Sequence, residues 1–237
     1  MDIPIDKFDF QKGEILLFDK EIDWTSFDLV QKVRNSLCRA LKIKKLKVGH
    51  AGTLDPKATG LMILCTGKAT KQIETLQAGE KEYIATLKLG ATTPSFDLET
   101  EEDVRFNTDH LTREMIKSTL NQFVGEQNQV PPIFSAVKID GKRAYEHARK
   151  GEKLDLKARP ITIYNIELLS FTEQTINIRV VCSKGTYIRA LARDIGKALN
   201  CGAYLTALRR TRIGTMKIEN AWKIDFFLKN FTKNETN

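Results

Sequence analysis

The segment from Gly49 to Gly60 reads GHAGTLDPKATG and places one carboxylate, Asp55, in the most basic part of the chain. From residue 29 to residue 73 there are ten Lys or Arg, and Asp55 is the only acidic residue. Pro56 disfavours helical geometry at Asp55, and the glycines permit positive φ or a close approach of backbone to a ligand. Since surrounding cations would keep Asp55 ionised, we interpret it as a nucleophile or base aimed at a bound polyanion.

A simpler interpretation of the same segment is a glycine-rich surface turn in which Asp55 is an ordinary turn residue. A protein that only holds phosphates, however, gains nothing from a carboxylate at this place, because that group repels the ligand. Other catalytic and phosphate-binding motifs fit poorly. Gly60 to Gly67 has the wrong spacing for a P-loop, GxGxxG is absent, and no Ser lies in a nucleophile-elbow sequence.

The basic residues fall into three separate blocks, at 29–73, 138–159 and 179–212, within a formal net charge of +8. Residues 97–103 form an acidic patch that balances part of this charge. One block alone is typical of a solvated face. Three blocks in one globular chain of 237 residues indicate a polyanionic partner, of which nucleic acid is the commonest.

Several protein classes are excluded. The longest uninterrupted apolar run is five residues (Leu61–Cys65), too short to cross a bilayer, and the first ten residues contain no apolar block of a secretion signal. The four cysteines, Cys38, Cys65, Cys182 and Cys201, form no CxxC pair, which disfavours zinc fingers and disulfide frameworks. We therefore expect reduced thiols and a cytoplasmic protein with no membrane contact.

The elements that must position Asp55 follow from the hydrophobic spacing. A buried strand is expected at 13–19, and Thr25 with Asp28 is typical of the start of a helix. The basic run 42–60 lacks a period and is expected to be an exposed loop. Further strands are expected at 61–65, 81–89, 161–169 and 175–182, helices at 68–77, 111–123 and 187–200, and a hairpin at KIDGKR. The mixture lacks a regular βαβ alternation, so the predicted class is α+β.

Six further blocks accompany the segment: GEILLFDK, KEYIATLKLGATTPSFD, QVPPIFSAVKIDGKRAYEHARKG, ARPITIY, CSKGTYIRALARDIG and ALRRTRIG. Together with GHAGTLDPKATGLMILCTGKATK they resemble, in order, the bacterial tRNA pseudouridine-55 synthase (TruB) family from residue 13 to residue 214. The resemblance implies a mixed, mostly antiparallel sheet with flanking helices and a central cleft. It also implies isomerisation of uridine to pseudouridine at position 55 in the T-arm of tRNA, with base flipping and no metal, nucleotide or redox cofactor.

The same resemblance assigns the reacting residues. Asp55 matches the catalytic aspartate, which could attack the sugar or the uracil or remove the C2′ proton. Tyr83 matches the tyrosine that stacks on the target uracil, although a strand aromatic on the face of Ala85 would look identical. Arg189 matches the arginine that pairs with the aspartate. Its position in the first turn of a helix, where cations are disfavoured, independently suggests an acidic partner.

Supporting roles follow in the same way. His50 matches a histidine that contacts the T-loop, Lys20 and Tyr187 match active-site support positions, and Leu208 matches an apolar wall of the base pocket. From the basic loop we expect contacts with the RNA backbone by Lys42, Lys44, Lys45 and Lys47.

Two departures from the family pattern stand out. The family usually continues the first block with Pro-Gly after the lysine, whereas this chain reads DKEIDWTS, so the loop after Lys20 is expected to differ. Many relatives also have a C-terminal RNA-binding domain, for which too few residues remain here. We therefore expect an N-terminal extension (1–12), a catalytic domain (13–217), and a short C-terminal segment with a polar tail (218–237), acting as a monomer without an obligatory protein partner.

Three other functions fit parts of the pattern. A non-catalytic RNA-binding protein would explain the charge but not the isolated Asp55. A nucleoside hydrolase or glycosidase usually needs two cooperating carboxylates, and Asp55 has no acidic neighbour within 25 residues on its N-terminal side. A guide-RNA-dependent pseudouridine synthase shares the motif but normally relies on the additional C-terminal domain and on protein partners.

Overall fold

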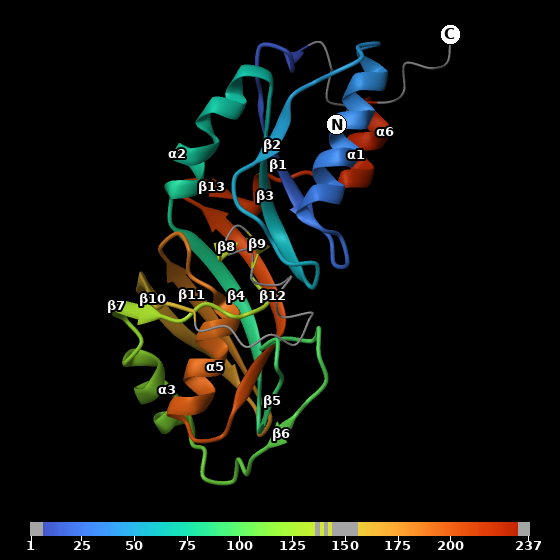
Figure 1. The fold of residues 1–237 in the computed structure, drawn as a ribbon. Coiled ribbons are helices and arrows are strands. Elements are labelled where there is room, and N and C mark those ends of the chain that lie inside the picture. Colours follow the sequence, from blue (N-terminus) through green and yellow to red (C-terminus); the bar gives the residue numbers. More distant parts are fainter. Residues whose placement is uncertain (1–6, 136–137, 140–141, 144–155, 232–237) are drawn as a thin grey trace. The chain divides into compact units, whose positions relative to one another are not determined.

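Residues Met1–Lys81 and Arg209–Asn237 form one unit of the chain, here called unit 1, and Glu82–Leu208 form unit 2. The structure is a computed structural model that describes residues 7–135, 138–139, 142–143 and 156–231 (Figure 1). Each unit combines strands and helices, and antiparallel pairs occur in both: Ile15–Lys20 pairs with Ala58–Thr66, and Arg159–Phe171 pairs with both Thr175–Cys182 and Gly125–Gln129. The predicted α+β class is confirmed.

Unit 1 is built around β3 (Ala58–Thr66), the strand predicted from the run LMILC. Its neighbours in the sheet are β1 (Ile15–Lys20), which pairs with it antiparallel, and the part of β12 (Ala203–Ile213) that belongs to this unit. Two short strands complete the arrangement: β2 (Val48–His50) pairs with β3, and β13 (Met216–Lys217) pairs with β12.

The uninterrupted apolar sequence of β3 is explained by burial on both of its faces. Leu61, Ile63 and Cys65 pack in a cluster with residues of the 3-10 helix Gly67–Gln72 and with Ile73 and Leu76 of α2 (Ile73–Ala78). On the other face, α1 (Ser26–Ala40) and α6 (Ile224–Phe231) lie side by side (Figure 1). A strand covered on both faces cannot alternate between apolar and polar residues.

The predicted start of α1 is confirmed in detail. The Thr25 hydroxyl accepts from the backbone N–H of Asp28, and the Asp28 carboxylate accepts from the backbone N–H of Thr25, which together form a capping box. Because this cap fixes the first turn, it also fixes the position of Ser26, which is buried.

An aromatic cluster joins the two ends of the described chain within unit 1. The ring of Phe18 in β1 contacts Phe227 with 5.1 Å between centroids, and Phe10 contacts Phe231 with 5.9 Å. Within the short C-terminal segment expected from residue 218, Ile224–Phe231 form α6, a helix that the sequence analysis did not predict and whose apolar face lies in this cluster. Residues 232–237 lie outside the described residues.

In unit 2 the strand order is β12, β4 (Lys81–Leu89), β11 (Thr175–Cys182), β10 (Arg159–Phe171) and β7 (Gly125–Gln129). Along β4, buried residues alternate with half-buried ones, as the sequence predicted. Two short strands, β5 (Ala91–Thr92) and β6 (Val104–Arg105), form a separate pair.

Among the described residues of unit 2, the helices are α3 (Arg113–Asn121) and α5 (Ile188–Ala198), both predicted from their spacing. The predicted KIDGKR hairpin is present as β8 (Lys138–Ile139) paired with β9 (Lys142–Arg143), while its two turn residues lie outside the described residues. Within the described part of the chain, no helix has the length and apolar character needed to span a membrane.

Candidate active site

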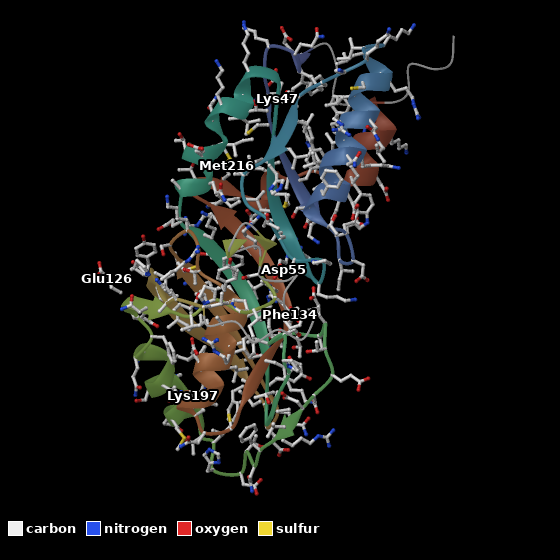
Figure 2. The ribbon with its side chains drawn as sticks, in the orientation of Figure 1. Lys47, Asp55, Glu126, Phe134, Lys197 and Met216 are labelled. Atoms are coloured by element: carbon white, nitrogen blue, oxygen red, sulfur yellow. The ribbon has the colours of Figure 1, made fainter. Side chains whose placement is uncertain are left out.

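Asp55 lies in unit 1, in the loop that enters β3, and it is half-buried (Figure 2). The backbone of this loop is held at five consecutive residues, Gly52–Pro56, because each carbonyl accepts a hydrogen bond from a defined donor. The donors are Arg210 for Gly52 and Thr53, Ser26 for Leu54, the backbone N–H of Ala58 for Asp55, and both Lys20 and the backbone N–H of Asp23 for Pro56. The expectation of an exposed loop over 42–60 was therefore wrong in part: Val48–His50 form a strand, β3 already begins at Ala58, and Ala51 and Leu54 are buried.

Arg210 on β12 provides the most extensive of these contacts and was missed as a functional residue in the sequence. Its side chain is 1% exposed. Nη2 donates to Gly52 O at 3.0 Å, Nη1 to Thr53 O at 3.4 Å, and Nε to Leu61 O at 2.8 Å. Gly60, with φ +107°, permits this approach, since an added Cβ would collide with the Arg210 backbone. The only signal in the sequence was the block ALRR.

Ser26 and Lys20 hold the other side of the loop. The Ser26 hydroxyl donates to Leu54 O at 3.0 Å and accepts from Leu54 N at 2.9 Å. Lys20, at the end of β1, is 1% exposed, and its Nζ donates to Glu21 O (2.9 Å), Trp24 O (2.7 Å) and Pro56 O (3.3 Å). Ser26 was also missed in the sequence, where it appeared only as a residue of the helix start.

The Lys20 ammonium is the cation that the structure associates with Asp55. Burial lowers the pKa of Lys20 to about 8, and the negative charge of Asp55 is the largest effect that opposes this decrease. Lys20 also holds the carbonyl of Pro56, the residue that follows Asp55. Its role as an active-site support residue stays a prediction.

His50, on β2, also lies in unit 1. Its Nδ1 is buried and has no hydrogen-bond partner within the described residues. Burial lowers the pKa of His50, and the Arg210 guanidinium acts in the same direction. A neutral histidine of this kind is suited to a polar contact and not to donating a proton as a cation. Its contact with the T-loop stays a prediction.

In unit 2, Arg189 has an acidic partner, Asp97, which was missed in the sequence except as part of an acidic patch. Arg189 Nη1 lies 3.3 Å from Asp97 Oδ2, and both side chains are almost fully buried. Nη2 also donates to Phe134 O at 2.8 Å. The remaining Asp97 oxygen, Oδ1, accepts from Glu99 N at 2.9 Å. An acidic partner thus exists for this first-turn arginine; its pairing with Asp55 stays a prediction.

The other predicted site residues of unit 2 lie on three elements. Tyr83 is buried on β4, on the same face as Ala85, and Leu208 is half-buried on β12. Tyr187 immediately precedes α5, and its backbone is held by Gln129: Tyr187 N donates to Gln129 Oε1 at 2.9 Å, and Gln129 Nε2 donates to Tyr187 O at 3.1 Å. Their roles in substrate binding stay predictions.

The three basic blocks differ in how their charges are used. In the third block most arginines form ion pairs with acidic residues of the same chain. The pairs are Arg179 with Glu82 and Glu167, Arg189 with Asp97, Arg193 with Asp194, Arg209 with Asp19, and Arg212 with Glu80. In the first block, Lys42, Lys44, Lys45 and Lys47 are exposed. The second block lies largely outside the described residues. The first block therefore provides the more accessible cationic surface.

Among the described residues, no group of three or more His, Cys, Asp or Glu is placed to hold a metal ion. The carboxylate of Asp55, supported by Lys20, is the candidate reactive group of unit 1.

Two family descriptions match the chain. The TruB family pseudouridylate synthase N-terminal domain matches residues 39–188, and the tRNA pseudouridylate synthase B C-terminal domain matches residues 189–237. The chain belongs to the TruB family of pseudouridylate synthases. It is therefore an enzyme of the isomerase class.

Similar TruB-family proteins cover nearly the whole chain. The tRNA pseudouridine synthase B of Phocaeicola vulgatus is 61% identical over 218 residues, which are 92% of this chain and 93% of that protein. The protein of the same name from Bacteroides thetaiotaomicron is 60% identical over 222 residues, 92% of each chain. Both relatives therefore have about the same length as this chain.

A related fold occurs in solved structures. A chain of a Cbf5-Nop10-Gar1 complex matches with a TM-score of 0.71 and 29% identity, and a chain of the archaeal box H/ACA sRNP Nop10-Cbf5 complex matches with 0.68 and 26%. Our chain is covered over 99% and 97% of its length, but it spans only 60% and 56% of those chains.

The low pKa of Lys20 predicts a specific dependence of stability on pH. Between about pH 8 and pH 10.5, Lys20 is deprotonated in the folded protein and protonated in the unfolded chain. Since the unfolded chain binds the additional proton, stability rises with pH in this window, by about 1 kcal/mol per pH unit. Urea unfolding at pH 7 and pH 9.5 should show that the parent gains stability relative to Lys20→Met.

The matched control is Lys57→Met, which removes an exposed lysine from the same loop. Its stability relative to the parent should change little between the two pH values. If the difference in stability between the parent and Lys20→Met is also independent of pH, the assignment of a low pKa to Lys20 is contradicted.

Proposed function

We propose that this TruB-family enzyme isomerises uridine 55 in the T-arm of tRNA to pseudouridine, with Asp55 as the catalytic carboxylate. The observation that carries the proposal is the fixed backbone of Gly52–Pro56, five consecutive carbonyls held by defined donors around a single carboxylate. The names of relatives about 60% identical, tRNA pseudouridine synthase B, support tRNA as the substrate.

Asp55 has the surroundings that a nucleophile or base requires. Its backbone cannot move easily, because Ser26 and Arg210 hold the two preceding residues and Lys20 holds the following one. Lys20 places a positive charge near the Asp55 carboxylate. The carboxylate is therefore presented in a fixed place, whether it attacks the sugar or the uracil or removes the C2′ proton.

The remaining residues bind the substrate in this proposal. The target base of a folded T-arm must leave its stack, at a cost of roughly a few kcal/mol. Stacking on Tyr83 against the apolar wall of Leu208 offsets part of this cost, and His50 contacts the T-loop as a neutral polar group. Tyr187 and Arg189 complete the site, each held in unit 2 by buried polar partners, Gln129 and Asp97.

Lys42, Lys44, Lys45 and Lys47 contact the RNA backbone in this proposal, because they are exposed. We propose no cofactor and no obligatory protein partner, a monomeric enzyme, and a cytoplasmic location, which the tRNA substrate supports.

A guide-RNA-dependent synthase is the second candidate, favoured by the fold shared with chains of Cbf5-containing complexes. Identity is higher with the bacterial tRNA pseudouridine synthase B proteins, and their length is similar to that of this chain. Incubating the purified protein with a T-arm transcript and mapping pseudouridine distinguishes the two. Modification without any guide RNA supports the tRNA enzyme, and modification only with a guide RNA supports the alternative.

We expect Asp55→Asn to lower pseudouridine formation on T-arm RNA by roughly three orders of magnitude or more, because an amide can act neither as nucleophile nor as base. RNA affinity should be unchanged or slightly higher, since one repulsive charge is lost. The control is Asp23→Asn, an exposed carboxylate in unit 1 that pairs with Lys57. Substantial activity of Asp55→Asn would rule out the proposed mechanism.

We expect Arg189→Lys to bind T-arm RNA nearly as well as the parent but to form pseudouridine at least about tenfold more slowly. Lysine keeps the charge but cannot donate to Asp97 and Phe134 O at the same time with the planar guanidinium geometry. Arg193→Lys changes an ion-paired arginine one turn further along α5 and controls for damage to the helix. Equal turnover of the two variants would contradict the proposal that Arg189 is an active-site residue.

A further inference from the structure

Three chain segments meet at the end of β3 that lies away from Asp55, and each brings an exposed lysine. Lys68 N donates to Lys12 O at 3.2 Å, and Gly67 N donates to Lys47 O at 2.8 Å. We call Lys12, Lys47 and Lys68 the distal lysine cluster. Backbone contacts of this kind hold the three residues together in the folded protein although they are separated in the sequence by 35 and 21 positions.

The ammonium groups of the distal lysine cluster are available to a ligand. Among the described residues, none of the three lysines forms an ion pair, although all are exposed. The nearest carboxylates in the sequence accept from backbone N–H groups and not from the ammonium groups of the cluster: Asp9 Oδ1 accepts from Lys12 N at 2.9 Å, and Glu14 Oε1 accepts from Asp9 N at 2.8 Å. The cluster contrasts with the buried or paired cations of the same unit, Lys20, Arg209 and Arg210.

The length of β3 sets the separation between the cluster and the reactive carboxylate. β3 contains nine residues, with Asp55 before its first residue and Gly67 after its last. At about 3.3 Å per residue the strand spans roughly 26 Å. Figure 2 shows Lys47 and Asp55 far apart within unit 1. A group bound at the cluster therefore cannot also occupy the site around Asp55.

An extended polyanion can reach both places. At the spacing of duplex DNA, one phosphate per about 1.7 Å of axis or about 3.4 Å per base pair, roughly 26 Å corresponds to about eight base pairs. The lysines are exposed point charges, which suits sequence-independent contact with phosphates and does not suit recognition of bases. The cluster thus fits the backbone of an RNA helix whose other end presents the target nucleotide.

We propose that the distal lysine cluster binds phosphates of an RNA helix about eight base pairs from the target uridine, so that affinity depends on the length of the helix. This inference rests on the proposed function. It extends that function from the T-loop to the helical RNA beyond it, and it adds Lys12 and Lys68 to the lysines that contact the backbone.

The test compares two RNAs that share one T-loop, a short hairpin and the same hairpin with its stem lengthened by about eight base pairs. The triple variant Lys12→Ala, Lys47→Ala, Lys68→Ala should bind the long RNA at least about tenfold more weakly than the parent. Its affinity for the short hairpin should change less than twofold. The salt dependence of long-RNA binding should flatten by about two to three in slope, as expected for three lost phosphate contacts.

The control triple is Lys32→Ala, Lys217→Ala, Lys229→Ala, which removes the same charge from exposed positions elsewhere in unit 1. It should weaken the binding of both RNAs by less than about threefold. A cluster variant that binds the long RNA as the control does, or loses equal affinity for both RNAs, would overturn the inference. Pseudouridine formed by the parent on the short hairpin is scored separately, so failure of the proposed function is recognised independently.

Discussion

The fold of unit 1 depends on hydrogen bonds to five consecutive peptide carbonyls in the loop Gly52–Pro56, which is not part of a strand. Each carbonyl of Gly52–Pro56 accepts a hydrogen bond from a defined donor, and a hydrogen bond of this kind typically contributes about 0.5–1.5 kcal/mol. The side-chain donors come from the end of β1 (Lys20), the start of α1 (Ser26) and β12 (Arg210). Three elements distant in the sequence are thus positioned by one loop, and Asp55 is presented at its centre.

Cations have two distinct physical uses in this protein. Lys20 and Arg210 are buried, and their charged groups donate to backbone carbonyls and, for Arg210, also to a methionine sulfur. This arrangement orders a loop and adds positive potential near Asp55. The lysines of the 42–47 segment, by contrast, are exposed and suit contact with a polyanion. A count of charges along the chain cannot distinguish cations that order the loop from cations that are free to contact RNA. The accessibility and the hydrogen-bond partners of each side chain distinguish them, and only part of the basic residues then belongs to the candidate RNA surface.

Local sequence patterns predicted most elements of the fold, because their causes are local. The capping box at Thr25, the alternation along β4 and the apolar run of β3 all follow from spacing. Asp55 also stood out locally, as one acid among cations. Arg210, Ser26 and Asp97 could not be identified in this way, since their roles arise from contacts with residues 28 to 158 positions away. Helix α6 was not predicted, because its apolar face packs against β1, which is far away in the sequence, and no local pattern indicates that contact.

The central claim is that the contacts of the loop position Asp55 for reaction, and Arg210 tests it most directly. Arg210→Lys keeps the positive charge but loses the planar guanidinium from which three separate nitrogens donate to Leu61 O, Thr53 O and Gly52 O, so Arg210 acts as a positioning residue through the loop. The measurement is the single-turnover rate of pseudouridine formation at saturating T-arm RNA, with the RNA dissociation constant and the unfolding midpoint measured on the same protein. The account predicts a folded variant with RNA affinity within about twofold of the parent and a rate at least about tenfold lower. A folded variant with the parental rate would contradict it.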